Sequence, residues 1–237
     1  MLVALALLAI SAIYASVGQA GGTGFIAVMA VTGVPIDQLR PTALAMNIVA
    51  VCYTTWRLHA LSLIDWRRLA TLAMPAVPAA FAGGLIVLPS GHYVFVTGAL
   101  LLAAAFLMVT RPRAARWTAA ASTPALLSLG AGSGLVSGLS GIGGGVFLAP
   151  ALIVLGWARP KEAAGLSAPF ILGNSIAGLA GVLLAGQEIA AEFPLYAAVA
   201  LLGAVVGTVL TPRISERTVR ILLAGLVSVA GFRLMSK

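Results

Sequence analysis

Apolar residues form long runs along almost the whole chain, and only short polar or glycine-rich segments separate them. Six runs have about 17 to 23 residues, enough for a helix to cross a hydrocarbon core about 30 Å thick. These long runs are 41–57, 69–88, 93–110, 163–185, 193–212 and 218–235. Four shorter runs are 2–17, 22–34, 124–137 and 143–157. The pattern predicts an all-α integral membrane protein in which the short runs do not each cross the bilayer.

The four short runs form two pairs, and a glycine-rich joint interrupts each pair, at 18–24 and at 138–145. If each pair is one broken span, alternate loops place eight Lys/Arg on one side of the membrane and six on the other. If each pair is a hairpin that returns to its starting side, the split becomes eleven and three. Because Lys and Arg accumulate in cytoplasmic loops, the count favours hairpins and predicts that both termini are extracytoplasmic.

With hairpins, the chain divides into two halves that each contain one broken or re-entrant helical hairpin and three transmembrane helices. The first half, 1–118, contains the hairpin 2–34, and the second, 119–237, contains the hairpin 124–157. The first half begins outside the membrane and the second begins inside, so the halves are predicted to be inverted-topology repeats. A weak sequence echo agrees, since GTGFI at 22–26 resembles GGGVF at 143–147.

Composition supports the membrane assignment and narrows the partners. Hydrophobic residues make up 61% of the chain and charged residues 8%, whereas soluble domains have about 25% charged residues. The net charge of +8 lies in short loops, which indicates contacts with anionic lipid headgroups and no nucleic-acid partner. The single cysteine, Cys52, excludes an internal disulfide and a cysteine metal cluster. No cofactor or metal is expected, and nothing indicates an oligomeric state.

The glycines of the two joints are the strongest functional signal. A hairpin tip at membrane depth leaves unpaired backbone N–H groups at the start of its second helix, and such groups are tolerated only where they line a cavity or are buried in protein. Helix N-termini of this kind bind anions. The sequence therefore predicts two facing helix N-termini, near 22–24 and 143–145, that hold one small anion. The alternative is helix packing, which is expected for Gly83, Gly84, Gly178, Gly181, Gly203 and Gly207.

Ionisable residues are absent from the centres of the predicted spans, which argues against a cation carrier and against a proton relay. A neutral site rich in hydrogen-bond donors suits an anion. The predicted substrate-binding residues are Gln19, Gly22, Thr23, Gly24, Thr42, Asn47, Ser140, Gly143, Gly144, Gly145, Ser167 and Asn174. Interhelical hydrogen bonds are the alternative role for Asn47 and Asn174, and helix capping or a bond back to the helix for Thr42 and Ser167. Arg40 is interpreted as an interfacial anchor, with attraction of an anion as the alternative.

These residues resemble the TauE/SafE family of membrane transporters, the sulfite exporter-like proteins. The resemblance is carried by SGLSGIGGGVFLAPALIVLG (137–156) and by ASVGQAGGTGFIAVMAVTGVP (15–35), with RPTALAMN and GLSAPFILGN following them. It covers the whole chain in layout. It implies movement of small sulfur-containing anions, such as sulfite, sulfonates and sulfoacetate, across the bacterial inner membrane. It also implies protons as a coupling ion, although the sequence shows no obvious proton carrier.

Three other functions remain open from the sequence. A passive anion channel would use the same neutral site, although inverted repeats favour a carrier with alternating access. The stretch 138–141 matches the GxSG motif of rhomboid proteases, but a serine nucleophile needs a base within reach, and both histidines lie in predicted loops. A membrane partner of another protein, with no transport activity, has no positive feature in its favour.

Overall fold

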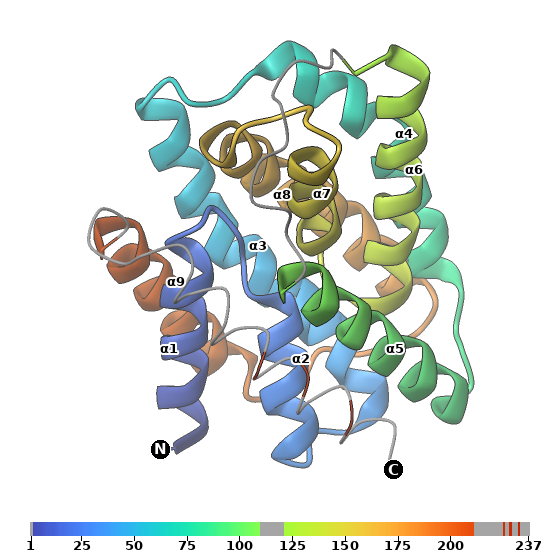
Figure 1. Ribbon diagram of the computed structural model, residues 1–237. Coiled ribbons are helices and arrows are strands. Elements are labelled where there is room, and N and C mark those ends of the chain that lie inside the picture. Colours follow the sequence, from blue (N-terminus) through green and yellow to red (C-terminus); the bar gives the residue numbers. More distant parts are fainter. Residues whose placement is uncertain (1, 110–120, 211–224, 226–227, 229–231, 233–237) are drawn as a thin grey trace.

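The computed structural model describes residues 2–109 and 121–210, together with residues 225, 228 and 232 (Figure 1). The described residues form nine α-helices and no strand. The helices are α1 (Leu2–Ala15), α2 (Gly22–Val31), α3 (Ile36–Ala60), α4 (Trp66–Leu85), α5 (Ser90–Val109), α6 (Thr123–Ser140), α7 (Gly145–Val154), α8 (Pro160–Leu184) and α9 (Phe193–Leu210). The expected span 218–235 and the basic loops at 110–120 and 211–220 fall outside the described residues, apart from the single positions just named.

The helices follow the apolar runs closely, with one correction at the second glycine-rich joint. The sequence predicts a break over 138–145, but α6 continues through Gly138 and ends at Ser140. Gly141 ends the helix in a left-handed conformation, with φ +81°, and its N–H donates to the carbonyl of Ser137 at 2.9 Å. This is the usual way in which glycine closes a helix. The non-helical tip of the second hairpin is therefore only 141–144.

Two short hairpins enter the molecule from opposite ends (Figure 1). Helix α1 runs inward from the N-terminal end, and α2 returns to that end. Helix α6 runs inward from the other end, and α7 returns to it. The tips meet inside the bundle, because a methyl group on Gly22 would collide with the carbonyl oxygen of Ile142. The long helices α3 and α8 pass alongside this meeting point.

Glycines allow the helices to pack backbone against backbone. Three glycines one turn apart on α6 lie against three carbonyl groups one turn apart on α4, and any Cβ there would collide with the facing oxygen. The pairs are Gly130 with Leu72, Gly134 with Ala76 and Gly138 with Ala80. The six glycines that the sequence assigns to packing are confirmed, since added Cβ atoms would lie between 2.1 and 3.4 Å from backbone atoms of other helices. This small-residue packing is typical of helices that associate in lipid.

Large apolar side chains cover much of the outer surface. Leu184 on α8 is 73% exposed and Met74 on α4 is 72% exposed. Within the described ranges, two helices are long and apolar enough to cross a membrane by length and composition alone, Trp66–Leu85 and Lys161–Leu184. Five further apolar stretches of helix within the described residues are shorter, and they include Ser90–Ala103 of α5 and Phe193–Val209 of α9. The sequence predicts six full-length spans, and two of them, 69–88 and 163–185, correspond to the helices that meet this limit.

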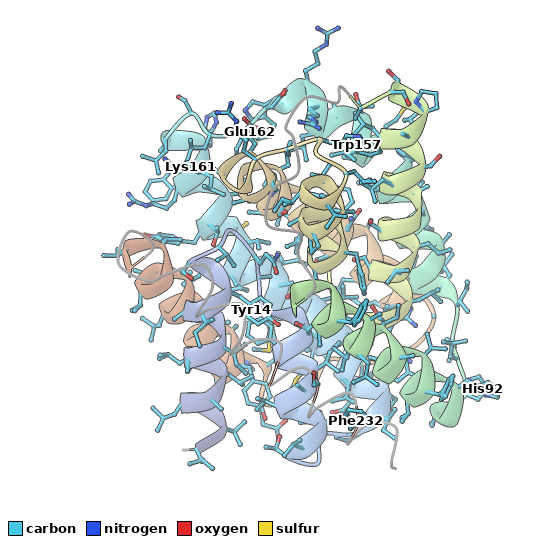
Figure 2. The ribbon with its side chains drawn as sticks, in the orientation of Figure 1. Tyr14, His92, Trp157, Lys161, Glu162 and Phe232 are labelled. Carbon is cyan, nitrogen blue, oxygen red and sulfur yellow. The ribbon has the colours of Figure 1, made fainter. Side chains whose placement is uncertain are left out.

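The described basic residues gather at the end of the bundle opposite the N-terminus. The joint between α3 and α4 and the joint between α7 and α8 both lie there, at the top of Figure 1. These segments carry Arg57, Arg67, Arg68, Arg159 and Lys161. Figure 2 shows Lys161 at this end and His92 at the other. Only Arg40, among the described basic residues, lies toward the N-terminal end.

Candidate functional site

Both hairpins restart their second helix on a glycine that follows another glycine in a left-handed conformation. Helix α2 begins at Gly22 after Gly21, with φ +111°, and α7 begins at Gly145 after Gly144, with φ +74°. Side chains other than glycine rarely adopt such φ values. No side chain caps either helix, so the N–H groups of each first turn have no side-chain acceptor. The helix starts near 22–24 and 143–145 are as the sequence predicts.

Asn47 of α3 lies between the two tips. Its side-chain Nδ2 is 2.7 Å from the position of a Cβ on Gly22 and 2.9 Å from that of a Cβ on Gly143. The same nitrogen donates to the carbonyl of Gly141 at 3.3 Å, while Oδ1 has no partner. Through its Nδ2, Asn47 thus makes the hydrogen bond between helical segments that the sequence offers as its alternative role. Its Oδ1 remains without a hydrogen-bond partner. We call the two tips, 18–24 and 141–145, together with Asn47 and Asn174, the hairpin junction.

Asn174 of α8 is buried completely, and neither atom of its amide has a hydrogen-bond partner. The contacts of two residues near it on α8 show which face of the helix Asn174 occupies. Ile171 contacts Gly143, and Gly178 would place a Cβ 3.4 Å from the Cα of Gly138. Because residues three and four apart share a helix face, Asn174 lies between these contacts and faces the second hairpin tip. Buried amides are nearly always hydrogen-bonded, so the unpartnered amide of Asn174 is an exception that a bound ligand or a water molecule would explain.

Further buried polar atoms without partners belong to residues of the hairpin junction or to their neighbours. Ser137 Oγ is unpartnered, and its Cβ is 3.3 Å from the position of a Cβ on Gly144. Ser175, next to Asn174, and Gln19, between α1 and α2, also have unpartnered oxygen atoms. Sequence reasoning selected Gln19 but missed Ser137 and Ser175. Serine is common in membrane helices, so nothing in the sequence alone distinguishes these two from packing residues.

Four other predicted binding residues have their side-chain hydroxyls engaged elsewhere. Thr23 bonds to Tyr14 of α1, which lies in the middle of the bundle in Figure 2. Ser140 Oγ donates to the carbonyl of Val136 at 2.6 Å. Ser167 Oγ donates to the carbonyl of Ala163 at 2.7 Å, which is the bond back to the helix that the sequence offered as its alternative. These hydroxyls hold the tips and helices in place.

Thr42 neither caps its helix nor bonds back to it, the two alternatives that the sequence offers to substrate binding. Its Oγ1 accepts a hydrogen bond of 2.9 Å from the N–H of Ala190, in the segment between α8 and α9. This bond joins the start of α3 to the connection that follows α8.

Gly24, another predicted binding residue, packs against Ile10 of α1, with 2.5 Å between an added Cβ and Ile10 Cγ2.

The interpretation of Arg40 as an interfacial anchor is wrong. Arg40 is only 1% exposed, and its guanidinium donates to carbonyls at the end of α4. Nη1 donates to Ile86 at 2.8 Å, and Nη2 donates to Gly83 at 3.0 Å and to Gly84. The last carbonyls of a helix have no partner within it, so they attract a donor. In the sequence Arg40 lies in the short polar joint between the runs 22–34 and 41–57, and nothing in that joint shows that its guanidinium is buried.

The two hairpins and their following helices match in length and spacing. Helices α2 and α7 have 10 residues each, and α3 and α8 have 25 each. Left-handed glycines recur at one spacing, at Gly18, Gly21 and Gly33 and at Gly141, Gly144 and Gly156. Counted from the first residue of each long helix, Asn47 of α3 corresponds to Ile171 of α8, which contacts Gly145 as Asn47 contacts Gly22. Asn47 and Asn174 therefore do not occupy equivalent positions, because Asn174 lies about one helical turn beyond Ile171.

The geometry around Ser140 does not suit a protease. Ser140 is completely buried and its hydroxyl bonds to its own helix. Both histidines, His59 and His92, are exposed, and His92 lies at the edge of the bundle (Figure 2). A serine nucleophile needs a base within hydrogen-bond reach, and neither histidine is its partner.

Comparison with known proteins points to one family. A family model described as sulfite exporter TauE/SafE matches residues 2–234. The chain is also 33% identical over 238 residues to a protein of Sinorhizobium fredii (strain NBRC 101917 / NGR234), described as probable membrane transporter protein y4hK. That alignment covers 98% of this chain and 96% of the relative.

Proposed function

The chain belongs to the sulfite exporter TauE/SafE family of membrane transporters, and from this premise we propose that it is a secondary transporter for small sulfur-containing anions of the sulfite, sulfonate or sulfoacetate class. Transport takes place across the bacterial inner membrane by alternating access. The hairpin junction holds the anion. This assigns the protein to transport and not to enzyme catalysis.

The unpartnered amide of Asn174 is the observation that carries the proposal. It faces a hairpin tip whose helix begins with uncapped N–H groups, and the amide of Asn47 lies on the same tip. Converging donors at a helix N-terminus favour an anion. The oxygen atoms of a sulfonate or sulfite accept hydrogen bonds from such donors without a lysine or arginine side chain at the point of contact.

The repeat arrangement supports alternating access. The hairpins enter from opposite ends, and their left-handed glycines recur at matched positions (Figure 1). Inverted repeats of this kind place a substrate site at the repeat interface and allow one half to rock against the other. We take 1–118 and 119–237 as the two repeats. A passive anion channel is the second candidate, since the same junction would serve it, and counterflow separates the two.

Topology gives a direct prediction. Five of the six described Lys and Arg residues lie at the end opposite the N-terminus, so both termini are expected to be extracytoplasmic. A C-terminal alkaline phosphatase fusion should be active, and a C-terminal green fluorescent protein fusion dark. The reverse pattern would contradict the hairpin topology. A fusion after Leu63, between α3 and α4, is the control and should give the cytoplasmic pattern.

Replacing Asn174 by leucine is expected to abolish transport and to stabilise the protein. Leucine has a similar volume and removes two buried polar atoms that have no partner. Each such group costs about 1–3 kcal/mol of stability when it is unsatisfied. Transport is measured as the initial rate in proteoliposomes, and stability as the midpoint of thermal unfolding in detergent.

The matched control for this variant is Thr54→Val. Thr54 is equally buried, but its hydroxyl donates to the carbonyl of Ala50 at 3.1 Å, within α3 and away from the tips. This control should transport normally. If Asn174→Leu transports like the wild type, the amide does not bind the substrate. If it loses both stability and transport, Asn174 is a structural residue.

A further inference from the structure

Arg40 carries a buried charge that nothing in the described structure neutralises. Its guanidinium donates to three carbonyls at the end of α4, and its Nε has no partner. Among the described residues, no carboxylate forms an ion pair with it. The carbonyl end of a helix supplies only about half of a negative charge. A buried charge is costly unless it is paired, so an uncompensated positive charge remains beside the bundle interior.

The backbone and the side-chain stem of Arg40 lie directly against the hairpin junction, while its guanidinium extends to the end of α4. A Cβ on Gly141, the first residue of the second tip, would be 3.1 Å from the Cα of Arg40 and 3.2 Å from its Cγ. Asn47, two helical turns further along α3, donates to the carbonyl of the same Gly141. Arg40 and Asn47 therefore flank one glycine of the tip.

The matching position in the other repeat has no charge. Arg40 is the fifth residue of α3, and Ala164 is the fifth residue of α8. Gly18 of the first tip approaches Ala164 as Gly141 of the second tip approaches Arg40, with 2.9 Å between an added Cβ and the Cβ of Ala164. If the residue at this position only had to pack against the tip glycine, alanine would be sufficient in both repeats. The arginine therefore adds something that packing does not require.

We propose that Arg40 is the specificity-determining charge of the anion site. It acts through its electrostatic field, from the N-terminal side of the hairpin junction, and its hydrogen bonds to α4 hold it in place. This deepens the proposed function and rests on the same junction. Charges several Å apart within a protein interact strongly enough to change an affinity by about tenfold. The site should consequently bind anions in order of their charge.

The test measures ligand binding by thermal stabilisation of the purified full-length protein. The probes are sulfoacetate with two negative charges, ethanesulfonate with one, and taurine with no net charge. Arg40→Gln removes the charge and keeps donors for the α4 carbonyls, and Arg40→Lys keeps the charge. Arg68→Gln is the matched control, because Arg68 also donates to a carbonyl, that of Trp157 at 2.6 Å, at the opposite end of the bundle.

Arg40→Gln should weaken sulfoacetate binding by about tenfold or more and ethanesulfonate binding by less, and leave taurine unchanged. Arg40→Lys should restore most of the affinity, and Arg68→Gln should match the wild type. An equal loss for all three probes would show a structural role and overturn the proposal. So would unchanged sulfoacetate binding in Arg40→Gln.

The wild type tests the proposal even if Arg40→Gln does not fold. Sulfoacetate should bind it more tightly than ethanesulfonate, and taurine least tightly; equal affinities would overturn the role of charge. If the wild type ranks the probes by charge but shows no counterflow of sulfur anions, the proposed transport function fails and this inference stands. If it transports them without such a ranking, only this inference fails. If no anion stabilises the protein, both fail.

Discussion

Gly144→Leu is expected to abolish transport while the protein remains folded. Gly144 has φ +74°, and a Cβ there would lie 2.7 Å from the carbonyl oxygen of Ser133 and 3.3 Å from the Cβ of Ser137. The leucine side chain would occupy the space in front of the first turn of α7, where donors converge. Backbone strain of about 1–2 kcal/mol and a shift of the four-residue tip away from the carbonyl of Ser133 are confined to the tip, so we expect the bundle to survive. The initial rate in proteoliposomes and the elution profile in detergent measure the two effects.

The control for Gly144→Leu is Gly132→Leu. Gly132 is an exposed residue of α6, and nothing lies within 4 Å of an added Cβ. This variant should keep both the elution profile and the transport rate of the wild type. Wild-type flux in Gly144→Leu would show that the tip of the second hairpin does not contact the substrate.

Gly134→Leu is expected to prevent folding altogether. Gly134 is two residues from Gly132 on the same helix, but its Cα faces the backbone of Ala76, and an added Cβ would collide with that carbonyl oxygen. Overpacking against a side chain costs about 1–3 kcal/mol, and here backbone would have to move along the whole interface between α4 and α6. We expect loss of the monodisperse peak in detergent. A stable, active Gly134→Leu protein would contradict the close contact of α4 and α6.

The sequence predicted the helices well because lipid imposes a simple rule. Every backbone group in the hydrocarbon core must be bonded internally, so an apolar run becomes a helix. The breaks at Gly21 and Gly144 were also predictable, since clustered glycines favour left-handed turns. The exact end of α6 was not predictable. Gly138 stays helical because it packs against Ala80 of α4, and this contact exists only in the folded bundle.

The sequence predicted the class of site, but it did not predict the hydrogen-bond partners of individual side chains. Glycine-rich joints and asparagines indicated an anion site, and the structure brings Asn47 and both tips together. The roles of Thr42 and Arg40 depend on segments far away in the sequence, Ala190 and the end of α4. Local spacing contains no information about such partners.

Counterflow in proteoliposomes tests the central claim most directly. Vesicles containing the purified protein are loaded with unlabelled sulfite or sulfoacetate and diluted into trace labelled anion, with taurine and chloride as comparison substrates. The account predicts transient, saturable accumulation of the labelled sulfur anion, which only a carrier produces. Flux without counterflow would show a channel. No flux of any sulfur anion would contradict the proposed substrate class.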